Sequence, residues 1–341
     1  MVVVVLLITL AAFAASPPPA TASRVDRPWQ QFKAKHSRSY GDLDEESRRY
    51  GIFRANLAYI ATENAKNHSF VLGVTPFADM TSDEFQQQRL GGVRNSSSGA
   101  SKGAHQWGGE TLPPSVDWQK AGATTPVADE NQHGCWGACW AFSAAGSIEG
   151  AYQIKHGQLL AFSEQQFMDC SGSRYGNQGC KGGTMDGAFK YAMVSALCLN
   201  ASYPYYGPVG RCQDTNCSAP GLAKPGIKRY QDVKGDRRSL MSAVAQQPVS
   251  VALHGAMGDK NAFQFYKGGV LKGDCGGGVV DHGVLVVGYG TQPAGLDYWK
   301  VKNSYGTEWG VQGYAFLERG KPGAGECGLD TSPLMSYPVL A

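Results

Sequence analysis

The sequence of 341 residues has few of the features that mark several classes of protein. Its net charge is only +3 and no basic block stands out, which argues against nucleic acid as a partner. No internal repeat is visible. The nine cysteines include no Cys-x-x-Cys pair with histidine support, which argues against a structural zinc site. What is present is a globular composition, rich in Gly and Tyr, and a length that suits about two domains.

The N-terminus carries one apolar run, and no Lys or Arg precedes it. Val2 to Ala15 is too short to cross a bilayer, and it is followed by Ser16 with three prolines and by the small residues Ala20-Thr21-Ala22. This order is typical of the apolar core and cleavage site of a secretory signal, although such a core usually follows a basic residue. The sequence therefore predicts a signal peptide over residues 1–22, with a buried N-terminal strand as the alternative.

An odd number of cysteines in a secreted chain predicts disulfides and one sulfur left over, which is either free or bonded to another molecule. Cys139 is the best candidate for a reactive thiol because two residues far downstream complete a set with it, His282 and Asn303. A thiolate can attack a carbonyl, an imidazole can take and return the proton, and an amide can hold the ring. Taken singly, the three would be a core cysteine, a surface histidine and a turn residue. Their contexts together favour nucleophilic catalysis.

Helical patterns give way to strand patterns along the chain. Residues 139–153, 163–169 and 184–194 are predicted to be helices, and Cys139 opens the first. Beyond about residue 220, short alternating apolar runs separated by glycine pairs such as Gly268-Gly269 predict antiparallel strands at Val249–Leu253, Val284–Val287, Tyr298–Val301 and Tyr314–Leu317. A helical half followed by a sheet half predicts an α+β chain with two lobes. A cleft between the lobes would place Cys139 opposite His282.

Residues 24–90 are polar and predicted to be mainly helical. Six residues recur at spacings of three or four and so share one helical face: Glu45, Arg49, Phe53, Asn56, Ile60 and Asn64. An ordinary amphipathic helix with a Glu45–Arg49 pair would show the same spacing. Residues 91–111 are rich in Gly and Ser and predict an exposed, cleavable linker.

The contexts of the three candidate catalytic residues resemble those of the papain-like cysteine proteases. The six-residue face is similar to the E-R-F-N-I-N pattern in the inhibitory pro-segment of cathepsin L-like members, plant ones above all. Trp29 and Phe32 precede it as in that family, and Gly73 to Asp79 follow it, with Thr75 where Asn is usual. The resemblance extends from Trp29 to Pro338. It implies a papain-like two-lobed fold, with a helical left lobe and an antiparallel, barrel-like right lobe behind a helical pro-segment.

The resemblance also implies how the chain is divided and what it does. Residues 1–22 would be the signal peptide, 23–111 the inhibitory pro-segment with its linker, and 112–341 the peptidase domain, whose lobes meet near residue 220. Leu112 to Trp118 is similar to the family's mature N-terminus. The chain would be a cysteine endopeptidase made as an autoinhibited zymogen. Its pro-segment would run through the cleft opposite to the substrate direction and leave on acidification.

Catalytic roles follow from the same resemblance. Cys139 would be the nucleophile, with its thiol pKa lowered by a helix N-terminus and an imidazolium. His282 would be general base and then general acid, and Asn303 would orient it. Gln132 and the Cys139 backbone N–H would stabilise the oxyanion.

The sequence departs from the family near this site. Three residues, Trp136 to Ala138, separate Cys135 from the nucleophile where the family has two, and two more are inserted around Asp129-Glu130. Either a small bulge absorbs the extra residue, or the oxyanion donor is misplaced, or the sequence contains an error. Tyr305 stands where Trp usually shields the His–Asn contact, so we expect a modest loss of activity. The alternative function is a catalytically impaired homologue that acts as a binding or regulatory protein.

The resemblance implies disulfides Cys135–Cys180, Cys170–Cys212 and Cys275–Cys327, whereas Cys198 and Cys217 either pair with each other or stay free. Gly182 and Gly183 would let an extended substrate lie against the backbone. The other substrate-binding residues implied are Thr184, Met185, Ala252, Val280, Gly283, Trp309 and Ser332. The pocket residues are small or apolar, so we expect a medium apolar side chain two residues before the scissile bond, at P2.

Asn-x-Ser motifs begin at Asn67, Asn95, Asn200 and Asn216. The first two would leave with the pro-segment, so Asn200 and Asn216 are the candidate glycosylation sites. We expect peptide and protein substrates and the chain's own pro-segment as partners, with cystatin-type inhibitors as further candidates, and no nucleic acid, membrane, metal or cofactor. The protein is expected to be a monomer of the secretory pathway, in a vacuole or lysosome or outside the cell.

Overall fold

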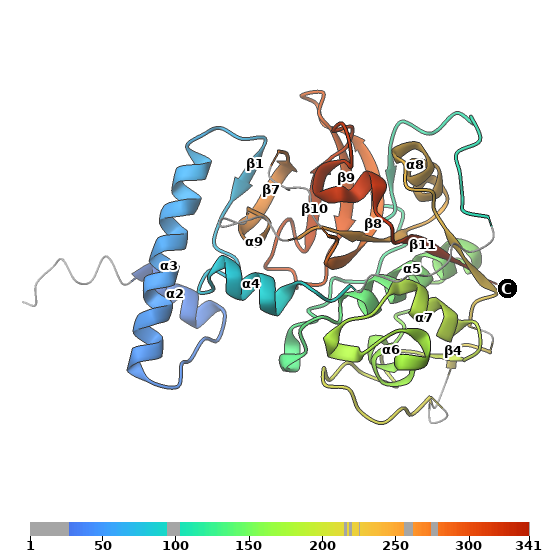
Figure 1. Cartoon of the computed structure of the whole chain (residues 1–341), viewed down its shortest axis with the longest axis horizontal. Helices are drawn as coiled ribbons and strands as arrows, with labels where there is room; N and C mark the ends of the chain where they lie inside the picture. The colour runs from blue at the N-terminus through green and yellow to red at the C-terminus, as the bar shows by residue number, and fades with distance from the viewer. Residues whose placement is uncertain are drawn as a thin grey trace, which may run out of the picture.

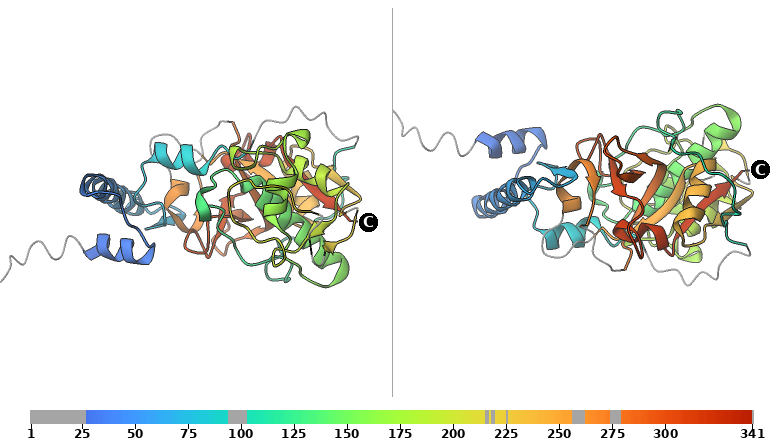
Figure 2. Two further views of the ribbon diagram at one scale, coloured as in Figure 1. Left: turned by 90° about the horizontal axis from the view of Figure 1, so that it is seen from below. Right: turned by 90° about the horizontal axis from the view of Figure 1, so that it is seen from above.

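The computed structural model describes residues 27–93, 103–214, 217, 220–224, 226–255, 262–273 and 279–340. The predicted signal peptide and most of the predicted linker lie outside these ranges. Figure 1 shows three parts: helices near the N-terminus at one end, a twisted sheet, and a group of helices beside the C-terminal end. Both views of Figure 2 keep α2 and α3 at that end. None of the helices in the described ranges is long and apolar enough to cross a bilayer.

The N-terminal part comprises α2 (Arg27–Lys35), α3 (Leu43–Asn64), β1 (Phe70–Leu72) and α4 (Ser82–Arg89). Local capping defines where α3 and α4 begin. The Asp42 side chain accepts from the Glu45 N–H at the start of α3, and Thr81 and Glu84 form a capping box at the start of α4. The prediction of a mainly helical segment is confirmed, but strand β1 was not predicted.

The helical lobe contains α5 (Cys139–His156), α6 (Glu164–Cys170), α7 (Met185–Ala192), and the short paired strands β3 (Leu197–Cys198) and β4 (Pro220–Leu222). The three predicted helices are confirmed, with ends that differ by up to three residues. Gly157, with φ +72°, ends α5 in the left-handed conformation that glycine adopts without strain.

The sheet lobe contributes eight strands to a nine-stranded sheet, whose ninth strand is β1 of the N-terminal part, and this lobe also contains two helices. Its elements are β2 (Val116–Asp117), β5 (Arg229–Asp232), α8 (Arg237–Gln246), β6 (Val249–Leu253), α9 (Ala262–Phe265), β7 (Tyr266–Leu271), β8 (His282–Thr291), β9 (Asp297–Lys302), β10 (Tyr314–Glu318) and β11 (Met335–Val339). The strand order is β1-β7-β10-β9-β8-β6-β11-β5, and β2 pairs with β8. The four predicted strands are present, and β6 has the predicted ends.

The four predicted strands pair antiparallel with one another, as expected, but one pairing to a further strand was not predicted and the expected place of the glycine pair was wrong. The pairing of β7 with β10 is parallel, whereas all other strand pairs that the described ranges form within this sheet are antiparallel. Gly268 and Gly269 lie inside β7 rather than between strands. Gly269 has φ +77°, and a Cβ there would lie 2.3 Å from the Ser69 carbonyl oxygen. The glycine therefore permits the close approach of β1, whose Phe70 pairs with it.

Each lobe has its own apolar core. One cluster joins the interior of the sheet lobe to aromatic side chains of the N-terminal part, among them Trp29, Phe53, Phe77 and Phe85. The second fills the helical lobe around Trp140. Helix α5 packs against strands β8, β6 and β11, so it is the element shared by both lobes. The predicted α+β architecture with two lobes is confirmed.

Candidate active site

Cys139 is the first residue of α5, and it is buried where the two lobes meet. Among the cysteines in the described ranges, it alone has a free thiol. The first N–H groups of a helix have no intrahelical acceptor and carry a partial positive charge, which favours a sulfur anion. The Gly283 N–H, on β8 of the other lobe, donates to Cys139 Sγ at 3.2 Å. The sulfur therefore lies beside the residue that follows His282.

His282 begins β8, and its ring is held by Asn303, which directly follows β9. The distance from His282 Nε2 to Asn303 Oδ1 is 2.8 Å. Asn303 Oδ1 also accepts the Ser304 backbone N–H at 2.8 Å, so this atom is an acceptor and His282 Nε2 must carry the hydrogen. His282 Nδ1 then has a free lone pair, and it is a buried atom with no hydrogen-bond partner in the described part of the chain. The tautomer leaves Nδ1 as the base.

Tyr305 covers this pair. Its ring stacks on the His282 ring with 4.9 Å between centroids and 25° between planes. Trp309 packs edge-on against Tyr305 and donates its indole N–H to the Phe263 carbonyl at 2.8 Å. Trp309, expected to bind substrate, is fully buried in this covered form, where its ring packs against Tyr305, Phe263 and Tyr266. The aromatic lid expected at Tyr305 is present, and the hydrogen bond beneath it is kept from water.

The N-terminal part runs directly over Cys139. The Gly91 and Val93 N–H groups both donate to the Asp281 carbonyl, at 2.8 and 3.3 Å, and the Gly92 carbonyl accepts the Gly183 N–H at 2.9 Å. Val93 and Gly183 form a parallel bridge. A Cβ on Gly92 would lie 2.5 Å from Cys139 Sγ, so only glycine lets the chain pass this close. Residues 91–93 therefore fill the cleft between the two lobes.

Burial under this segment sets the charge state of the site. It raises the pKa of the Cys139 thiol well above its ordinary value, with a further increase from the charge of Glu130. It lowers the pKa of His282 from 6.5 to about 4, against the opposing hydrogen bond to Asn303. The sequence-based expectation of a lowered thiol pKa is thus wrong for this covered form. A neutral thiol and a neutral imidazole are the stable state here.

Of the residues expected to bind substrate, Gly182 and Gly183 contact residues 91–93, and the others are buried. Gly182 and Gly183 form one wall, where a Cβ on Gly182 would meet the Gly91 and Gly92 carbonyls at 3.1 and 3.2 Å. Val93 is buried in the same cluster as Met185, Ala252 and Val280. Thr184, Gly283 and Ser332 are also buried, and the Thr184 hydroxyl caps α7 by accepting from the Gly187 N–H.

The extra residue before Cys139 forms a bulge. The backbone turns through His133, Gly134 and Gly137, which have φ values of +67°, +75° and +102°. The side chain of Trp136 is 44% exposed, and the Arg89 guanidinium lies 5.5 Å from its ring. The loop accommodates the insertion in this bulge, with the adjacent disulfide Cys135–Cys180 formed.

Gln132 lies at the surface near the lid residue Tyr305, and its role as oxyanion donor stays a prediction. It is exposed on the short turn Gln132–Gly134, and a Cβ on Gly207 would lie 3.1 Å from its carbonyl oxygen. It lines a pocket together with Arg89, Tyr205 and Tyr305. The sequence reasoning missed a buried carboxyl two residues earlier, Glu130, whose charge acts on Cys139. The insertion around Asp129-Glu130 was the signal that could have pointed to it.

The six-residue face on α3 holds the chain that crosses the cleft. Arg49 contacts Glu45 at 2.7 Å and Glu84 at 2.8 Å, and it also donates to the Asp79 carbonyl. Asn56 donates to the Ala78 and Met80 carbonyls at 2.9 Å each, and Asn64 exchanges two hydrogen bonds with Leu72 in β1. Phe53 and Ile60 are buried in the shared core. These six residues therefore fasten the following pro-segment chain to α3, and we call them the latch. The Glu45–Arg49 ion pair is one part of the latch.

Thr75 reaches the peptidase domain, although it replaces the usual Asn. Its hydroxyl donates to the Gln264 carbonyl at 2.8 Å and accepts from the Phe77 N–H at 3.3 Å. Phe77 packs edge-on against Tyr305, with 5.2 Å between ring centroids. The segment is therefore fixed to the lid of the candidate site.

Disulfides join Cys135 to Cys180, Cys170 to Cys212 and Cys198 to Cys217. The first two are the expected pairs, and the third is one of the alternatives left open. Cys275 lies outside the described residues, and Cys327 is disulfide-bonded.

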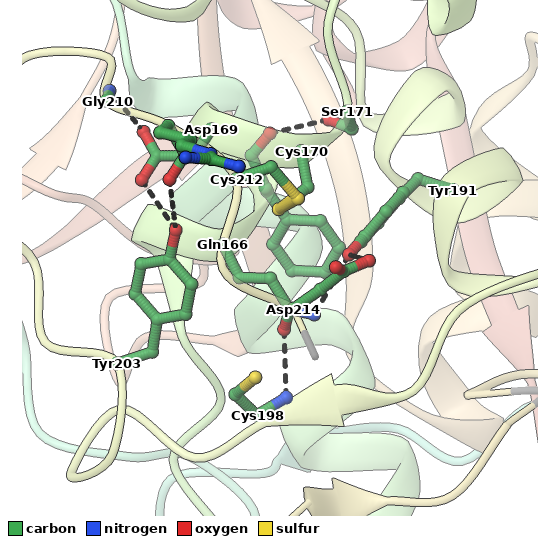
Figure 3. The surroundings of a disulfide bond; sticks show 12 residues. Gln166, Asp169, Cys170, Ser171, Tyr191, Cys198, Tyr203, Gly210, Cys212 and Asp214 are labelled. Atoms are coloured by element: carbon green, nitrogen blue, oxygen red, sulfur yellow. Dashed lines mark hydrogen bonds between the residues drawn. A yellow bond between two sulfur atoms is a disulfide. The ribbon is translucent and has the colours of Figure 1, made fainter. Parts of the chain in front are cut away.

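Figure 3 shows the surroundings of Cys170–Cys212, where Asp169 accepts from Tyr203 at 2.7 Å and from the Gly210 N–H. The two sulfurs and a carboxylate oxygen of Asp214 lie within 4.8 Å of one another, an arrangement that could hold a metal ion. The sulfurs of Cys170 and Cys212 are joined in a disulfide, however, so they are not thiolate ligands.

The asparagines of the Asn-x-Ser motifs differ in exposure and in hydrogen bonding. Asn200 is half-buried, and its amide nitrogen, the atom that would carry the glycan, donates to Glu164 at 2.8 Å. Asn67 is exposed with φ +53°. Asn95 and Asn216 lie outside the described residues.

Comparisons with known proteins agree on one family. The model of the papain family cysteine protease matches residues 112–337, and that of the cathepsin propeptide inhibitor domain matches residues 29–85. The chain is 42% identical to a senescence-specific cysteine protease of Oryza sativa subsp. japonica, over 97% of this chain and 94% of that protein. It is 38% identical to vignain of Ricinus communis, over 91% and 85%.

Solved structures of precursors are also similar. A recombinant stem bromelain precursor superposes with a TM-score of 0.83 at 35% identity, covering 93% of this chain and 99% of that one. A digestive procathepsin L 3 of Tenebrio molitor superposes with a TM-score of 0.78 at 35% identity, with the same coverage. These relatives are named as proteases or their precursors, which favours an active enzyme over an impaired homologue.

Proposed function

The chain belongs to the papain family of cysteine proteases and is a cysteine endopeptidase made as a zymogen, and from this we propose which residues carry the reaction. Cys139 is the nucleophile, His282 the general base and acid, and Asn303 the residue that orients His282. One observation carries the assignment: the free thiol lies against the Gly283 N–H, next to a histidine whose tautomer is set by Asn303.

The geometry supports a two-step hydrolysis. His282 Nδ1 takes the thiol proton, Cys139 Sγ bonds to the substrate carbonyl carbon, and the carbonyl oxygen becomes an oxyanion. His282 returns the proton to the leaving amine as the C–N bond breaks, which leaves a thioester. Water then attacks the thioester with His282 as base, and the acid product leaves as the proton returns to the thiol. Asn303 holds the ring orientation in each step.

Removal of residues 91–93 from the cleft changes the site from the neutral thiol and imidazole to the thiolate–imidazolium pair. In the zymogen the same burial makes both charged forms costly, because it raises the pKa of Cys139 and lowers that of His282. Hydration of the open cleft removes the larger part of this cost, and the start of α5 then favours the thiolate. The thiolate–imidazolium pair is the form that reacts.

Substrate selectivity at P2 is assigned to the pocket that Val93 enters. Val93 is buried with Met185, Ala252 and Val280, none of which carries a charge. A medium apolar side chain such as Leu, Val or Phe fits this surface, whereas an Arg would bury an unpaired charge. We propose the same preference for protein substrates, and a peptide panel cleaved best with Arg at P2 would contradict it.

The remaining features follow from the family and the predicted signal peptide. We propose that the chain enters the secretory pathway, that its cleavage sites lie within residues 1–22 and 105–113, and that it acts as a monomer in a vacuole or lysosome or outside the cell. Its domains are those expected from the sequence, with the peptidase beginning at Leu112. Cystatin-type proteins are proposed inhibitors, because they would need the same open cleft.

Labelling with an epoxide that requires an ionised thiol tests the catalytic assignment. Acid-activated protein should take up one label, at Cys139, and the zymogen should take up label far more slowly. Cys139→Ser is the matched control, since it removes the sulfur but keeps the size of the side chain. Absence of label after the pro-segment has been removed would refute the assignment.

A further inference from the structure

One basic side chain of the pro-segment, Arg89, is held by residues of the peptidase domain next to the cleft. Its guanidinium donates to Asn131 Oδ1 at 2.6 Å and lies 5.5 Å from the centre of the Trp136 ring. The Phe77 ring of the pro-segment lies 5.4 Å from the same guanidinium. The backbone carbonyl of Arg89 accepts the Tyr305 hydroxyl at 2.8 Å. The peptidase domain therefore contacts both the main chain and the side chain of this residue, as an enzyme contacts a residue of its substrate.

The groups that hold the guanidinium are positioned by contacts within the peptidase domain. The backbone N–H and the side-chain Nδ2 of Asn131 both donate to Asp129 Oδ1, at 2.9 Å each. Asn131 Oδ1 is thereby presented as an acceptor, with the Asp129 carboxylate beside it. Asp129 forms an antiparallel bridge with Tyr305, and Trp136 directly follows one half of a disulfide of the same domain. The acceptor and the ring therefore belong to the mature enzyme as well as to the zymogen.

Arg89 lies on the leaving-group side of the nucleophile. Gly92 passes over Cys139 Sγ, and Val93 is buried in the pocket assigned to P2. The residues that precede Gly92 therefore cover the other half of the cleft, which takes the substrate residues after the scissile bond. Arg89 is three positions from Gly92, so the groups that hold it face one of the positions P1′ to P3′. The substrate is expected to run in the opposite direction, but a long side chain can reach the same ring and acceptor from a backbone of either direction.

The charged groups in this region divide between the two parts of the chain. Among the described residues that line the pocket beside Tyr305, all three cationic or titratable basic side chains come from the pro-segment and all three carboxyl groups come from the peptidase domain: His36, Arg38 and Arg89 against Asp129, Glu164 and Glu308. Departure of the pro-segment removes the basic side chains and leaves the carboxyl groups. The leaving-group side of the mature cleft therefore attracts positive charge.

We propose that Trp136, Asn131 and Asp129 form a specificity subsite for a basic side chain, Arg above all, at one of the positions P1′ to P3′ of the substrate. This rests on the proposed function, to which it adds a preference after the scissile bond. A Trp ring is the aromatic face that attracts a cation most strongly, and a planar guanidinium can stack on it while it donates to the Asn131 oxygen. Lys keeps the charge but loses the stacking, so it should be the second choice. The inserted residue Trp136 thus supplies the ring that selects Arg.

Pairs of peptides cleaved in competition by the acid-activated enzyme test the proposal. Each pair carries Leu at P2 and differs at P1′, P2′ or P3′, where one peptide has Arg and the other has citrulline, which has nearly the same shape but no charge. At one of the three positions, wild type should favour Arg about tenfold in kcat/KM, and added salt should reduce the ratio. A third peptide with Lys at that position should fall between the two. Because both peptides of a pair meet the same enzyme, the ratio does not depend on how much of a preparation has folded.

Variants assign the preference to the named residues. Trp136→Ala and Asn131→Ala should each reduce the ratio to about threefold or less, whereas Trp136→Phe keeps a weaker ring and should give an intermediate ratio. Val194→Ala is the control and should keep the wild-type ratio, because Val194 is an apolar residue of the same lobe that is 50% exposed, close to the 44% of Trp136.

Two results would overturn the subsite while the proposed function stands: a ratio near one at all three positions in wild type whose Cys139 takes up the epoxide, or a ratio that Trp136→Ala leaves unchanged. If wild type cleaves none of the peptides and takes up no epoxide, the proposed function fails and the subsite fails with it.

Discussion

The replacement Gly92→Ala should weaken autoinhibition, because the cleft has no space for a methyl group at this position. The added Cβ would lie 2.5 Å from Cys139 Sγ and 2.8 Å from Gly137 Cα. The sulfur can rotate away, but the Gly137 backbone is held by the neighbouring disulfide Cys135–Cys180. The segment must therefore lift from the cleft.

The size of the effect follows from the contacts that lifting breaks. Residues 91–93 exchange three backbone hydrogen bonds with Asp281 and Gly183. At about 0.5–1.5 kcal/mol net for each bond, the loss is about 1.5–4.5 kcal/mol. This corresponds to a roughly 10- to 10³-fold larger population of the open cleft.

The rate at which the epoxide labels Cys139 in the intact zymogen at neutral pH measures that population. Gly41→Ala is the matched control, since it lies in the same pro-segment and a Cβ there has no neighbour within 4 Å. Gly92→Ala should be labelled faster by the stated factor and Gly41→Ala at the wild-type rate. Equal rates for Gly92→Ala and wild type would show that the close approach over Cys139 does not limit access.

Three further predictions concern the latch, the lid and the effect of pH. Asn56→Ala leaves two carbonyls of the pro-segment unsatisfied and should cost the zymogen about 2 kcal/mol in the free energy of unfolding, but leave the melting temperature of the mature enzyme unchanged. Tyr305→Ala should lower kcat/KM at least about tenfold by admitting water to the His282 hydrogen bond, whereas Tyr305→Phe keeps the stacked ring and should lose less than about threefold; equal losses would refute the shielding role. Between pH 6.5 and about 4 the unfolded chain binds a proton at His282 and the folded zymogen does not, because folding lowers the pKa of this residue to about 4. The free energy of unfolding should therefore fall by about 3 kcal/mol as the pH is lowered through this interval. Differential scanning fluorimetry of the Cys139→Ser zymogen from pH 7 to 4 should therefore show a larger fall in melting temperature than the same zymogen carrying His282→Asn, and parallel falls would contradict it.

Local patterns in the sequence predicted the elements that rest on local physics. Strand β6 is a short, mostly apolar run whose five residues are all buried, and its predicted ends match the observed ones. Helix α5 begins at the predicted Cys139. Strand β1 was not predicted, because a run of three residues forms a strand only by pairing with another strand, here β7. The parallel pairing of β7 with β10 likewise depends on tertiary contacts that no local pattern encodes.

The candidate site was predicted in part for the same reason. Cys139, His282 and Asn303 lie in distinctive local contexts, and the structure brings them together. Gln132 was chosen by its position along a loop, and because an insertion changes where each position of a loop lies in space, its role stays a prediction. Glu130 carries no motif of its own. Its burial, and the carboxyl oxygen for which the described residues offer no hydrogen-bond partner, are features that only three-dimensional packing reveals.

Maturation changes one border of the nine-stranded sheet. In the zymogen, Phe70 to Leu72 run alongside β7 and occupy its outward-facing amides and carbonyls. Once the pro-segment departs, that row is bare and can template the addition of another extended chain. Maturation therefore exposes β7 as an edge strand at the same time as it activates the protease. The detached pro-segment is the first chain available to pair with this edge again.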